Sequence, residues 1–548
     1  MSQSFDRRSF LAGGLALGAG AALAGALADG AGLAGAAATN GPGRNGVSNA
    51  TPKRGGSLTF GIDTEESGFS PVDARWDEGG FLYGRALFDP LAVVNASGGV
   101  EPYLAQSITS NSDYTVWTIT LRPGISFHDG TPLDANALNL NFEKQAASKL
   151  LGPAFADNIA STSVTGPMTV ALTMKKPWGP FPYYLAQAQT GYVAAPSMLN
   201  SPSGNENPVG TGPFTFQEWV PNSHMTVSRN PHYWRKGYPY LDTITYKPII
   251  DSNSRDQALE TGEIDIEHTG SPESILLFRG NRKWSYYDNS GQVIGQPTVQ
   301  CIMLNTSTSP FDNHTLRRAM AKAINQRQFV AVINKNVDAP MRGLFIPGSQ
   351  YYTKTAYPTY DPAGAAKLVK QVSASGSPVS FTLNSTSAPD VLRAAQFLQQ
   401  AWQQAGMQVN INILAQSALI NNALGGKYQA TLWRQFGAVD PDLNYVWWTP
   451  TLATGPLALN MARNVDPRIE AALLTGRSTT EHAVRVKAYQ QINQYLAQDI
   501  PYLWLARDTW AVVANPKVQN FANPHTPQGS KAIAYDEGVL WPTQIWVR

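Results

Sequence analysis

Cysteine is almost absent from this sequence, because Cys301 is the only one in 548 residues. A single cysteine excludes disulfide bonds within the chain and zinc sites built from several thiolates. No cysteine lies near the amino terminus, which excludes the lipid anchor that a lipobox cysteine carries. We expect Cys301 to be a small buried residue of a core.

Charged side chains are also scarce, and their signs are balanced. They make up 15% of the residues, with 41 Lys and Arg against 39 Asp and Glu and a formal net charge of +2. An average protein has about 25% charged residues. There is no basic stripe for nucleic acid and no polybasic run for an acidic membrane surface. Beyond the first residues, no apolar run is long enough to span a bilayer.

The common catalytic motifs are missing. The sequence has no G-x-S-x-G elbow, no H-E-x-x-H and no phosphate loop. VGTGPF resembles a dinucleotide fingerprint, but Thr215 stands where the third glycine belongs. DPDLNY at 440–445 begins like a calcium loop, but Tyr445 replaces the glycine and Thr451 the bidentate glutamate. We therefore expect no metal, no cofactor and no catalysis, and a polar turn at 440–445.

What the sequence does contain begins at its amino terminus. Arg7 and Arg8 precede an uncharged run over 11–28, and small residues follow. A charged head, an apolar middle and an A-x-A site are the parts of an export signal. The stretch RRSFL, with Arg7, Arg8, Phe10 and Leu11, resembles the twin-arginine signal. The chain is therefore predicted to be exported, with the twin-arginine translocase as its partner.

The limits of this signal follow from small and polar residues. We expect residues 1–38 to be a cleaved signal peptide, with cleavage after Ala36 or Ala38. Residues 39–55 are rich in Gly, Asn, Pro and Ser, so a disordered linker is predicted there. The alternative for the apolar run is a transmembrane anchor.

The remaining chain has the hydrophobic patterns of an α/β protein. Alternating apolar residues predict strands in SLTFGID, TVWTITL and TVALTM. From about residue 300 helical periodicity appears, beginning with one helical face over 311–333 capped by Asp312 or Asn313. VSFTL, DVLRAAQFLQQAWQQAG and MQVNINIL predict a strand–helix–strand unit with parallel strands. RVKAYQQINQYLAQ predicts a last long helix, and IPYLWLA a strand after it.

Three blocks together resemble one family. They are YTVWTITLRPGISFHDGTPLDANALNLNFE at 114–143, VGTGPFTFQEWVPNSHMTVSRNPHYW at 209–234, and FDNHTLRRAMAKAINQRQF at 311–329. In type, order and spacing they are similar to the extracytoplasmic solute-binding proteins of ABC transporters, in the peptide/nickel family that includes the dipeptide- and oligopeptide-binding proteins.

This resemblance implies an α/β fold of two lobes with hinged mixed sheets, closing over a ligand. Lobe one would comprise residues 56–300, with an extra subdomain at about 86–210, and lobe two residues 301–510. Residues 511–548 would return to lobe one. The implied function is that of an exported monomer that captures a peptide or similar small polar solute in an interlobe cleft. It would deliver this solute to membrane permease subunits of an ABC transporter.

The resemblance also indicates which residues would bind the ligand. In peptide-binding relatives, backbone bonds hold the ligand by strand addition, and an aspartate ahead of a D/E-P turn pairs with its ammonium. Here that place falls on Gly437 or Phe436, with Arg434 nearby. An arginine favours carboxylate or phosphate groups, so we expect an anionic or polar ligand end at Arg434. The alternative is an ion pair of Arg434 with Asp440 or Asp442.

Further contacts are expected on both sides of the ligand. In lobe one, Glu66 and Ser67 follow the first strand, and Glu66 is a candidate partner for a ligand ammonium. The remaining predicted ligand-binding residues are Trp76, Trp433, Gln435, Trp448 and Trp504, of which the tryptophans suit a core equally well.

Other functions remain open from the sequence alone. Within the same fold, the alternatives are a nickel-chelate or saccharide receptor, or a signalling receptor without a permease. A different class, an extracytoplasmic hydrolase, would use the alternating acids Glu263, Asp265 and Glu267. A solvated strand edge is the structural interpretation of these acids.

Overall fold

The computed structural model describes residues 46–48, 50–65, 67–76, 78–291, 295–533 and 539–548. The expected signal peptide, with Arg7, Arg8, Phe10 and Leu11, lies outside these residues. Contacts gather these described residues into one compact unit. Within the described ranges, no helix has the length and apolar character needed to cross a membrane.

Part of the predicted disordered linker is ordered against the fold. The amide of Gly55 donates to the carbonyl oxygen of Tyr240 at 2.9 Å, and the carbonyl oxygen of Gly46 accepts from the amide of Ala522 at 3.2 Å. The polar composition of this stretch predicts disorder, whereas these two backbone bonds join Gly46 and Gly55 to the fold; the linker over 39–55 stays a prediction.

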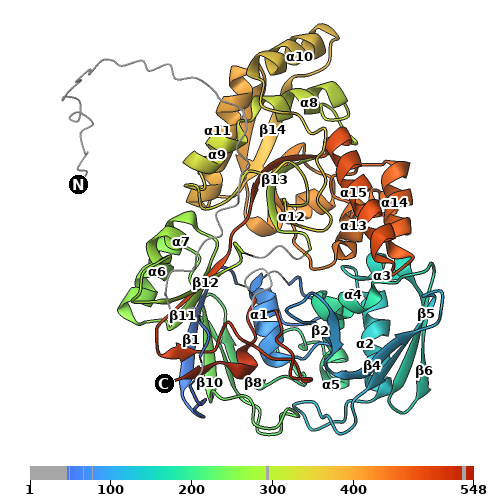
Figure 1. The fold of residues 1–548 in the computed structure, drawn as a ribbon, viewed down its shortest axis with the longest axis vertical. Helices are drawn as coiled ribbons and strands as arrows, with labels where there is room; N and C mark the ends of the chain where they lie inside the picture. Colours follow the sequence, from blue (N-terminus) through green and yellow to red (C-terminus); the bar gives the residue numbers. More distant parts are fainter. Residues whose placement is uncertain (1–45, 49, 66, 77, 292–294, 534–538) are drawn as a thin grey trace, which may run out of the picture. The chain divides into compact units, whose positions relative to one another are not determined.

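A mixed sheet forms the part of the chain that we call lobe one (Figure 1). Its strand order is β12-β18-β11-β1-β10-β9-β8, and β1 runs parallel to both β10 and β11. Leu58, Phe60 and Ile62 of the first strand are buried, as their alternation predicts. The strands are β1(Ser57–Ile62), β8(Phe214–Val220), β9(His224–Arg229), β10(Thr243–Pro248), β11(Ile266–Thr269), β12(Ser285–Asp288) and β18(Ala511–Ala514). The helices of lobe one are α1(Glu78–Leu87), α5(Pro196–Leu199), α6(Ser252–Thr261) and α7(Pro272–Phe278).

A second, antiparallel sheet with its own core forms a subdomain within the lobe-one sequence. The sheet has the order β4-β5-β7-β6. Its strands are β4(Ala105–Ser110), β5(Val116–Leu121), β6(Ile159–Gly166) and β7(Thr169–Met174), and its helices are α2(Ala135–Ala147), α3(Gly152–Asn158) and α4(Phe181–Gln187). Asp134 caps α2 by accepting from the amide of Ala137. Short strands β2(Ala92–Val94) and β3(Val100–Pro102) pair beside it, and β19(Val518–Gln519) pairs with β20(Trp546–Val547) near the carboxyl terminus.

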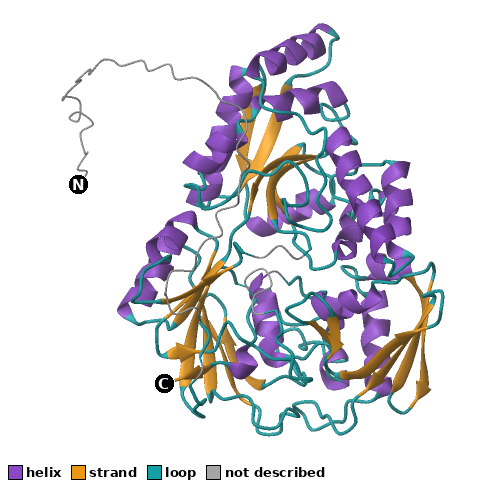
Figure 2. Cartoon of the chain, in the orientation of Figure 1, coloured by secondary structure: helices purple, strands orange, loops and turns teal. Residues whose placement is uncertain are grey.

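A third sheet forms what we call lobe two, with helices on both sides of it (Figure 2). Its order is β15-β14-β16-β13-β17, and β14 is parallel to both β15 and β16. The strands are β13(Val299–Leu304), β14(Ser380–Ser385), β15(Gln408–Ile413), β16(Ala430–Gln435) and β17(Tyr502–Arg507). The helices are α8(His314–Ala323), α9(Gln326–Val332), α10(Pro362–Ala374), α11(Pro389–Gln404), α12(Gln416–Leu424), α13(Tyr445–Trp448), α14(Pro467–Arg477) and α15(His482–Asp499).

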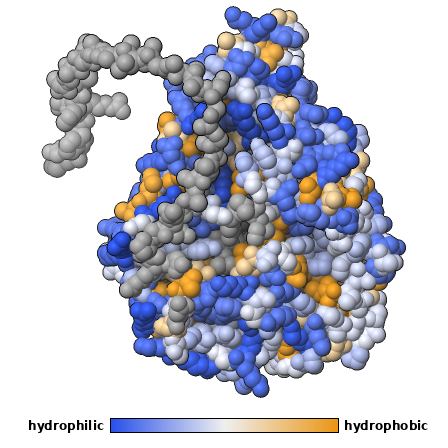
Figure 3. All heavy atoms as spheres, viewed as in Figure 1, coloured by the Kyte–Doolittle hydropathy of each residue, from blue (hydrophilic) through white to orange (hydrophobic). Residues whose placement is uncertain are grey.

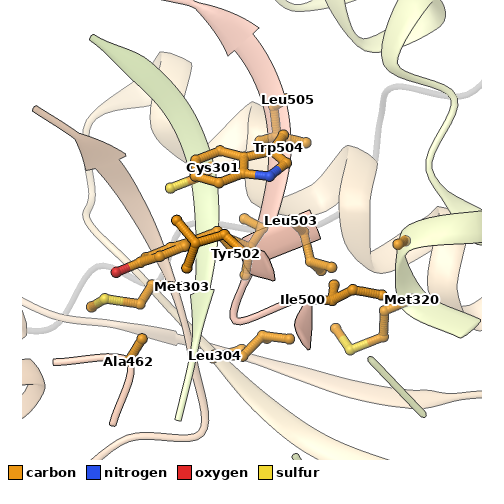
Figure 4. Packing of buried hydrophobic residues seen from close by; sticks show 14 of the residues in the cluster. Cys301, Met303, Leu304, Met320, Ala462, Ile500, Tyr502, Leu503, Trp504 and Leu505 are labelled. Carbon is orange, nitrogen blue, oxygen red and sulfur yellow. The ribbon is translucent and has the colours of Figure 1, made fainter. Parts of the chain in front are cut away.

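The lobe-two core contains side chains of β13 and β17 as well as of the surrounding helices. Cys301 and Trp504 are fully buried there beside Met303, Tyr502 and Leu503 (Figure 4). Cys301 is therefore a buried core residue, as expected. Burial raises the pKa of its thiol well above the usual value. On the face drawn in Figure 3, hydrophilic residues predominate and apolar ones gather in scattered patches.

Two chain segments connect lobe one to lobe two. One runs from β12 to β13 through Asn289 and Thr298, and the other runs from β17 to β18 through residues 508–510. The segments bond each other, since the amide of Asn289 donates to the carbonyl oxygen of Trp510 at 3.2 Å and that of Asp508 donates to Thr298 at 2.9 Å. We refer to these two crossing segments as the hinge.

Candidate functional site

The crossing segments leave each lobe at the sheet edge where ligands are usually bound. In lobe one, the parallel strands β1 and β11 both end there, because Gly61 pairs with Glu267 and Thr269 pairs with Ala511 at the start of β18. In lobe two, β16 ends there, because Gln435 pairs with Val299 at the start of β13. Ligands of open α/β sheets bind outside the carboxyl ends of strands. The candidate site is therefore the region where these ends meet the hinge.

Arg434, near the end of β16, reaches the second crossing segment. Its Nε lies 2.7 Å from Oδ2 of Asp508, and its guanidinium carbon lies 4.8 Å from the centre of the Trp510 ring. The Arg434 side chain is 43% exposed, whereas Asp508 is buried. The expected alternative, an ion pair of Arg434 with Asp440 or Asp442, is wrong, because strand direction carries Arg434 toward the hinge.

Asp440 and Asp442 are instead bound by two other arginines of lobe two. Arg485 Nη2 donates to both carboxylate oxygens of Asp440 at 2.6 Å, and Arg477 donates to Asp442 at 3.0 and 3.1 Å. Burial raises the pKa of Asp440 to about 6, although Arg485 opposes this shift. The polar turn expected at 440–445 is thus an arginine-bound turn that begins the 3-10 helix η2(Pro441–Asn444).

Lobe one contributes a histidine and an aspartate to the same region. Nδ1 of His268, on β11, lies 3.4 Å from Oδ1 of Asp63, which follows β1. The His268 ring stacks on Trp510 with 4.6 Å between ring centres and 13° between planes. Burial by itself would raise the pKa of Asp63, but His268, Arg255 and Arg434 together hold it well below the usual value. Asp63 and Arg434 therefore interact electrostatically across the two lobes.

An aromatic face continues from Arg434 along lobe two. Phe436 is 36% exposed, and its ring centre lies 6.5 Å from that of Trp433 and 5.5 Å from that of Trp447. Both tryptophans are half-buried. The amide of Gly437, at one of the positions where peptide-binding relatives would carry an aspartate, donates to Thr298 Oγ1 at 3.2 Å. We refer to Trp433, Phe436 and Trp447 as the aromatic wall.

Three of the predicted ligand-binding tryptophans belong to cores. Trp448 and Trp504 lie in the hydrophobic core of lobe two. Trp76 lies in the core of lobe one, against Phe81 and Tyr192 with ring centres 5.5 and 5.2 Å away. Gln435 is also buried, at the end of β16. All four side chains are buried among neighbouring residues, and direct ligand contact by them stays a prediction.

The residues expected after the first strand are only partly described. Glu66 lies outside the described residues, and Ser67 is exposed. The neighbouring Glu65 accepts from the amide of Asn222 at 2.7 Å and from the indole of Trp219 at 3.2 Å. Its carboxylate therefore fastens the β8–β9 turn.

The alternating acids of the hydrolase alternative do not converge. Glu263 is exposed and bonds Lys247 at 3.0 Å, while Asp265 lies 2.6 Å from Lys517. Glu267 is fully buried, and burial together with Asp256 raises its pKa to about 9. The first acid precedes β11 and the last is buried inside the lobe, so the three carboxylates are not gathered at a solvated strand edge. Among the described residues, no group of three or more His, Cys, Asp or Glu side chains is arranged to hold a metal ion.

Sequence reasoning missed Asp63, His268, Asp508 and Trp510. Their only signal was position, since Asp63 is the last residue of the first predicted strand segment and residues 508–510 lie just beyond the last one. Neither position indicates in the sequence that Asp63 and residues 508–510 lie in the same region of the fold.

Comparison with known proteins gives a family match and a fold match. Residues 99–454 match the family described as "Bacterial extracellular solute-binding proteins, family 5 Middle". The glutathione-binding protein GsiB of Pectobacterium atrosepticum is 28% identical over 446 residues, covering 76% of this chain and 82% of that protein. The structure of DppA from Helicobacter pylori in complex with peptide STSA aligns with TM-score 0.79 at 22% identity, covering 90% of this chain and 98% of the other. That of AgaA from A. tumefaciens R10 in complex with agropinic acid also gives 0.79 at 22%, covering 90% and 99%. These likenesses confirm the two-lobe fold.

Proposed function

This chain belongs to family 5 of the bacterial extracellular solute-binding proteins, and on that premise we propose that it captures short peptides or peptide-like solutes between its lobes. The observation that carries the proposal is the family match over residues 99–454. The described relatives agree with it, since GsiB binds glutathione and DppA is in complex with a peptide. We further propose that the ligand passes to the permease of an ABC transporter, and that the amino terminus is a twin-arginine signal.

The lobe limits expected from the sequence are part of this proposal. β17 ends at Arg507 and β18 begins at Ala511 in the other sheet, which supports a return to lobe one at about residue 511. Likewise β12 ends at Asp288 and β13 begins at Val299, which supports a crossing near residue 300. The ligand would then lie beside the two crossing segments.

The aromatic wall indicates the class of side chain that the ligand carries. A partly exposed phenylalanine between two half-buried tryptophans offers apolar surface that a ligand side chain can cover. Burying such surface is worth about 25 cal/mol for each Å². We therefore propose peptide-like ligands with at least one apolar side chain, held otherwise by backbone hydrogen bonds.

Arg434 contributes less to this proposal than the sequence suggested. Asp508 already neutralises its charge at 2.7 Å, so a ligand carboxylate gains only part of the attraction of an uncompensated arginine. The half-exposed guanidinium still favours an anionic ligand end over a cationic one. Peptide-binding relatives carry an aspartate that pairs with the ligand ammonium, and this chain has no acid at that place. Asp63, which is held in its charged form, is the lobe-one group that we propose for this role.

The experiment is calorimetry with di- to pentapeptides, glutathione, sugars and nickel chelates. We expect micromolar dissociation constants, equivalent to about −8 kcal/mol, for peptides with an apolar side chain. Phe436→Ala should weaken their binding about tenfold and leave glycine peptides unchanged. Tyr360→Ala, which removes another exposed aromatic of lobe two, is the matched control. Binding of sugars or nickel chelates without peptides would overturn the proposal.

A further inference from the structure

Lobe two also meets the subdomain, through contacts that use none of the hinge residues 508–510. The loop between β7 and α4 carries Trp178 and Gly179. Trp178 Nε1 donates to Oδ2 of Asp442 at 2.6 Å, and the Arg477 guanidinium carbon lies 4.2 Å from the centre of the Trp178 ring. A lobe-one side chain thus inserts into the buried ion pair of lobe two.

Burial makes this contact strong. Trp178, Asp442 and Arg477 are all at least nine-tenths buried. A hydrogen bond from an indole to a carboxylate is charge-assisted, and bonds of this kind are about twice as strong as neutral ones. The Arg477 guanidinium also lies 3.7 Å from the centre of the Tyr445 ring, so aromatic rings of both lobes contact one cation. Cation–π contacts are strongest where water is excluded.

Backbone contact accompanies the side-chain contact. The amide of Gly179 donates to the carbonyl oxygen of Arg477 at 2.7 Å. A Cβ at Gly179 would lie 2.6 Å from the carbonyl carbon of Thr479 and 2.7 Å from its oxygen. The Gly179 backbone itself is outside the left-handed region, so alanine fits its conformation. An alanine here therefore affects the approach of the lobes and not the local turn.

Weaker contacts surround these two. The hydroxyl of Tyr445 donates to Asp157 Oδ2 at 3.1 Å, and the hydroxyls of Tyr114 and Thr480 are 2.7 Å apart. Lys176 Nζ lies 4.0 Å from Oε1 of Glu470, with Lys176 largely exposed. Exposed pairs of this kind contribute little. Arg477 also donates to Oδ1 of Asn158 in α3, so Trp178 and Gly179 supply the buried part of the contact together with this bond.

We propose that Trp178 and Gly179 form a latch that holds the two lobes closed, and that docking this latch on Asp442 and Arg477 is a function of the subdomain. Closure then has a hinge at the two crossing segments and a separate fastening at the subdomain. The latch sets the population of the closed state, and a ligand that binds the closed state gains affinity in proportion to that population. The inference holds for any ligand class.

Two variants test the latch from the lobe-one side and leave the lobe-two ion pair intact. Trp178→Phe keeps an aromatic ring but removes the indole donor. Gly179→Ala adds one methyl group against the Thr479 backbone. We expect each to lower the ratio of closed to open molecules about tenfold. Trp284→Phe is the matched control, because Trp284 is buried in lobe one and its ring contacts Phe278.

The readout is the distance between the subdomain and lobe two, measured by fluorescence energy transfer without ligand. Val164→Cys and Val465→Cys provide labelling positions that are 41% and 66% exposed. The native Cys301 is fully buried and takes no label while the protein is folded. Thermal unfolding of each variant is recorded in parallel.

The latch predicts longer distances for Trp178→Phe and Gly179→Ala, unchanged distances for Trp284→Phe, and melting temperatures of the latch variants close to wild type. Wild-type distances in both latch variants would overturn the proposal. Lowered melting temperatures with unchanged distances would also overturn it, since they indicate a purely structural role. Because no ligand is added, failure here is separate from failure of the peptide proposal.

Discussion

The buried pair Asp442–Arg477 allows a quantitative test of how lobe two is held together. Asp442 accepts from Arg477 at 3.0 and 3.1 Å, from Trp178 at 2.6 Å and from the hydroxyl of Tyr489 at 3.2 Å. Asp442→Ala removes the acceptor of all these donors and leaves the Arg477 cation buried and uncompensated.

The magnitude follows from burial, because both partners are at most 5% exposed. Removing one partner of a buried pair costs about 3–5 kcal/mol. For a lobe of about 200 residues, each kcal/mol lowers the melting temperature by roughly 2–4 °C. We therefore expect Asp442→Ala to lower the melting temperature of lobe two by about 10 °C. Replacing both partners, with Asp442→Ala and Arg477→Met together, should recover more than half of the loss.

The assay is thermal and urea unfolding followed by tryptophan fluorescence and circular dichroism. Arg468→Ala is the control, because Arg468 bonds Asp466 at 2.7 Å but is 49% exposed. An exposed pair is worth less than about 1 kcal/mol. If Asp442→Ala costs no more than Arg468→Ala, or if the double variant is less stable than Asp442→Ala, the reasoning from burial is refuted.

Two further predictions concern buried titratable groups. Burial first, and then Asp256, raise the pKa of Glu267 to about 9. Between the unfolded pKa near 4.3 and 9, the folded state therefore holds a proton that the unfolded state has lost. The free energy of unfolding falls as pH rises through this range. Glu267→Gln, which loses no proton, should gain stability relative to wild type between pH 5 and 9 in urea unfolding, and parallel curves would contradict this assignment. Cys301, fully buried with its thiol pKa raised by burial, should resist a chromogenic thiol reagent in the native protein and react completely in denaturant; rapid native reaction would contradict its place in the core.

Local structure was largely predictable from the sequence. The alternating segments became β1, β5 and β7, and the strand–helix–strand prediction became β14, α11 and β15 with parallel strands. The resemblance to solute-binding proteins is likewise confirmed by the family match. These features depend on periodicity and on motifs that lie within one stretch of chain.

The ends of helices were less predictable from the sequence, because single polar side chains determine where a helix begins. The helix predicted over 311–333 is interrupted between α8 and α9, where the Asn325 side chain caps a new helix by accepting from the amide of Gln328. Asn313 caps α8, as one of the two expected candidates. Ile413 continues the apolar alternation of β15 but is half exposed, because β15 is the edge strand of its sheet.

The candidate site was predictable only in part. Trp433 and Arg434 lie near the hinge, but Trp448 and Trp504 lie in a core. A tryptophan suits a core and a binding wall equally well, so its identity does not separate the two. The pairing joins Arg434 of β16 to Asp508 of the second crossing segment, which is far away in sequence, and no local pattern encodes it.

The central claim is that this protein grips a small solute between two lobes and releases it unchanged. The most direct measurement is native mass spectrometry of the protein with its best-binding peptide, followed by denaturation and mass analysis of the released solute. The account predicts a single bound peptide that is recovered at its original mass after prolonged incubation. Recovery of cleaved or modified peptide would contradict it, as would the absence of any bound solute at saturating concentration.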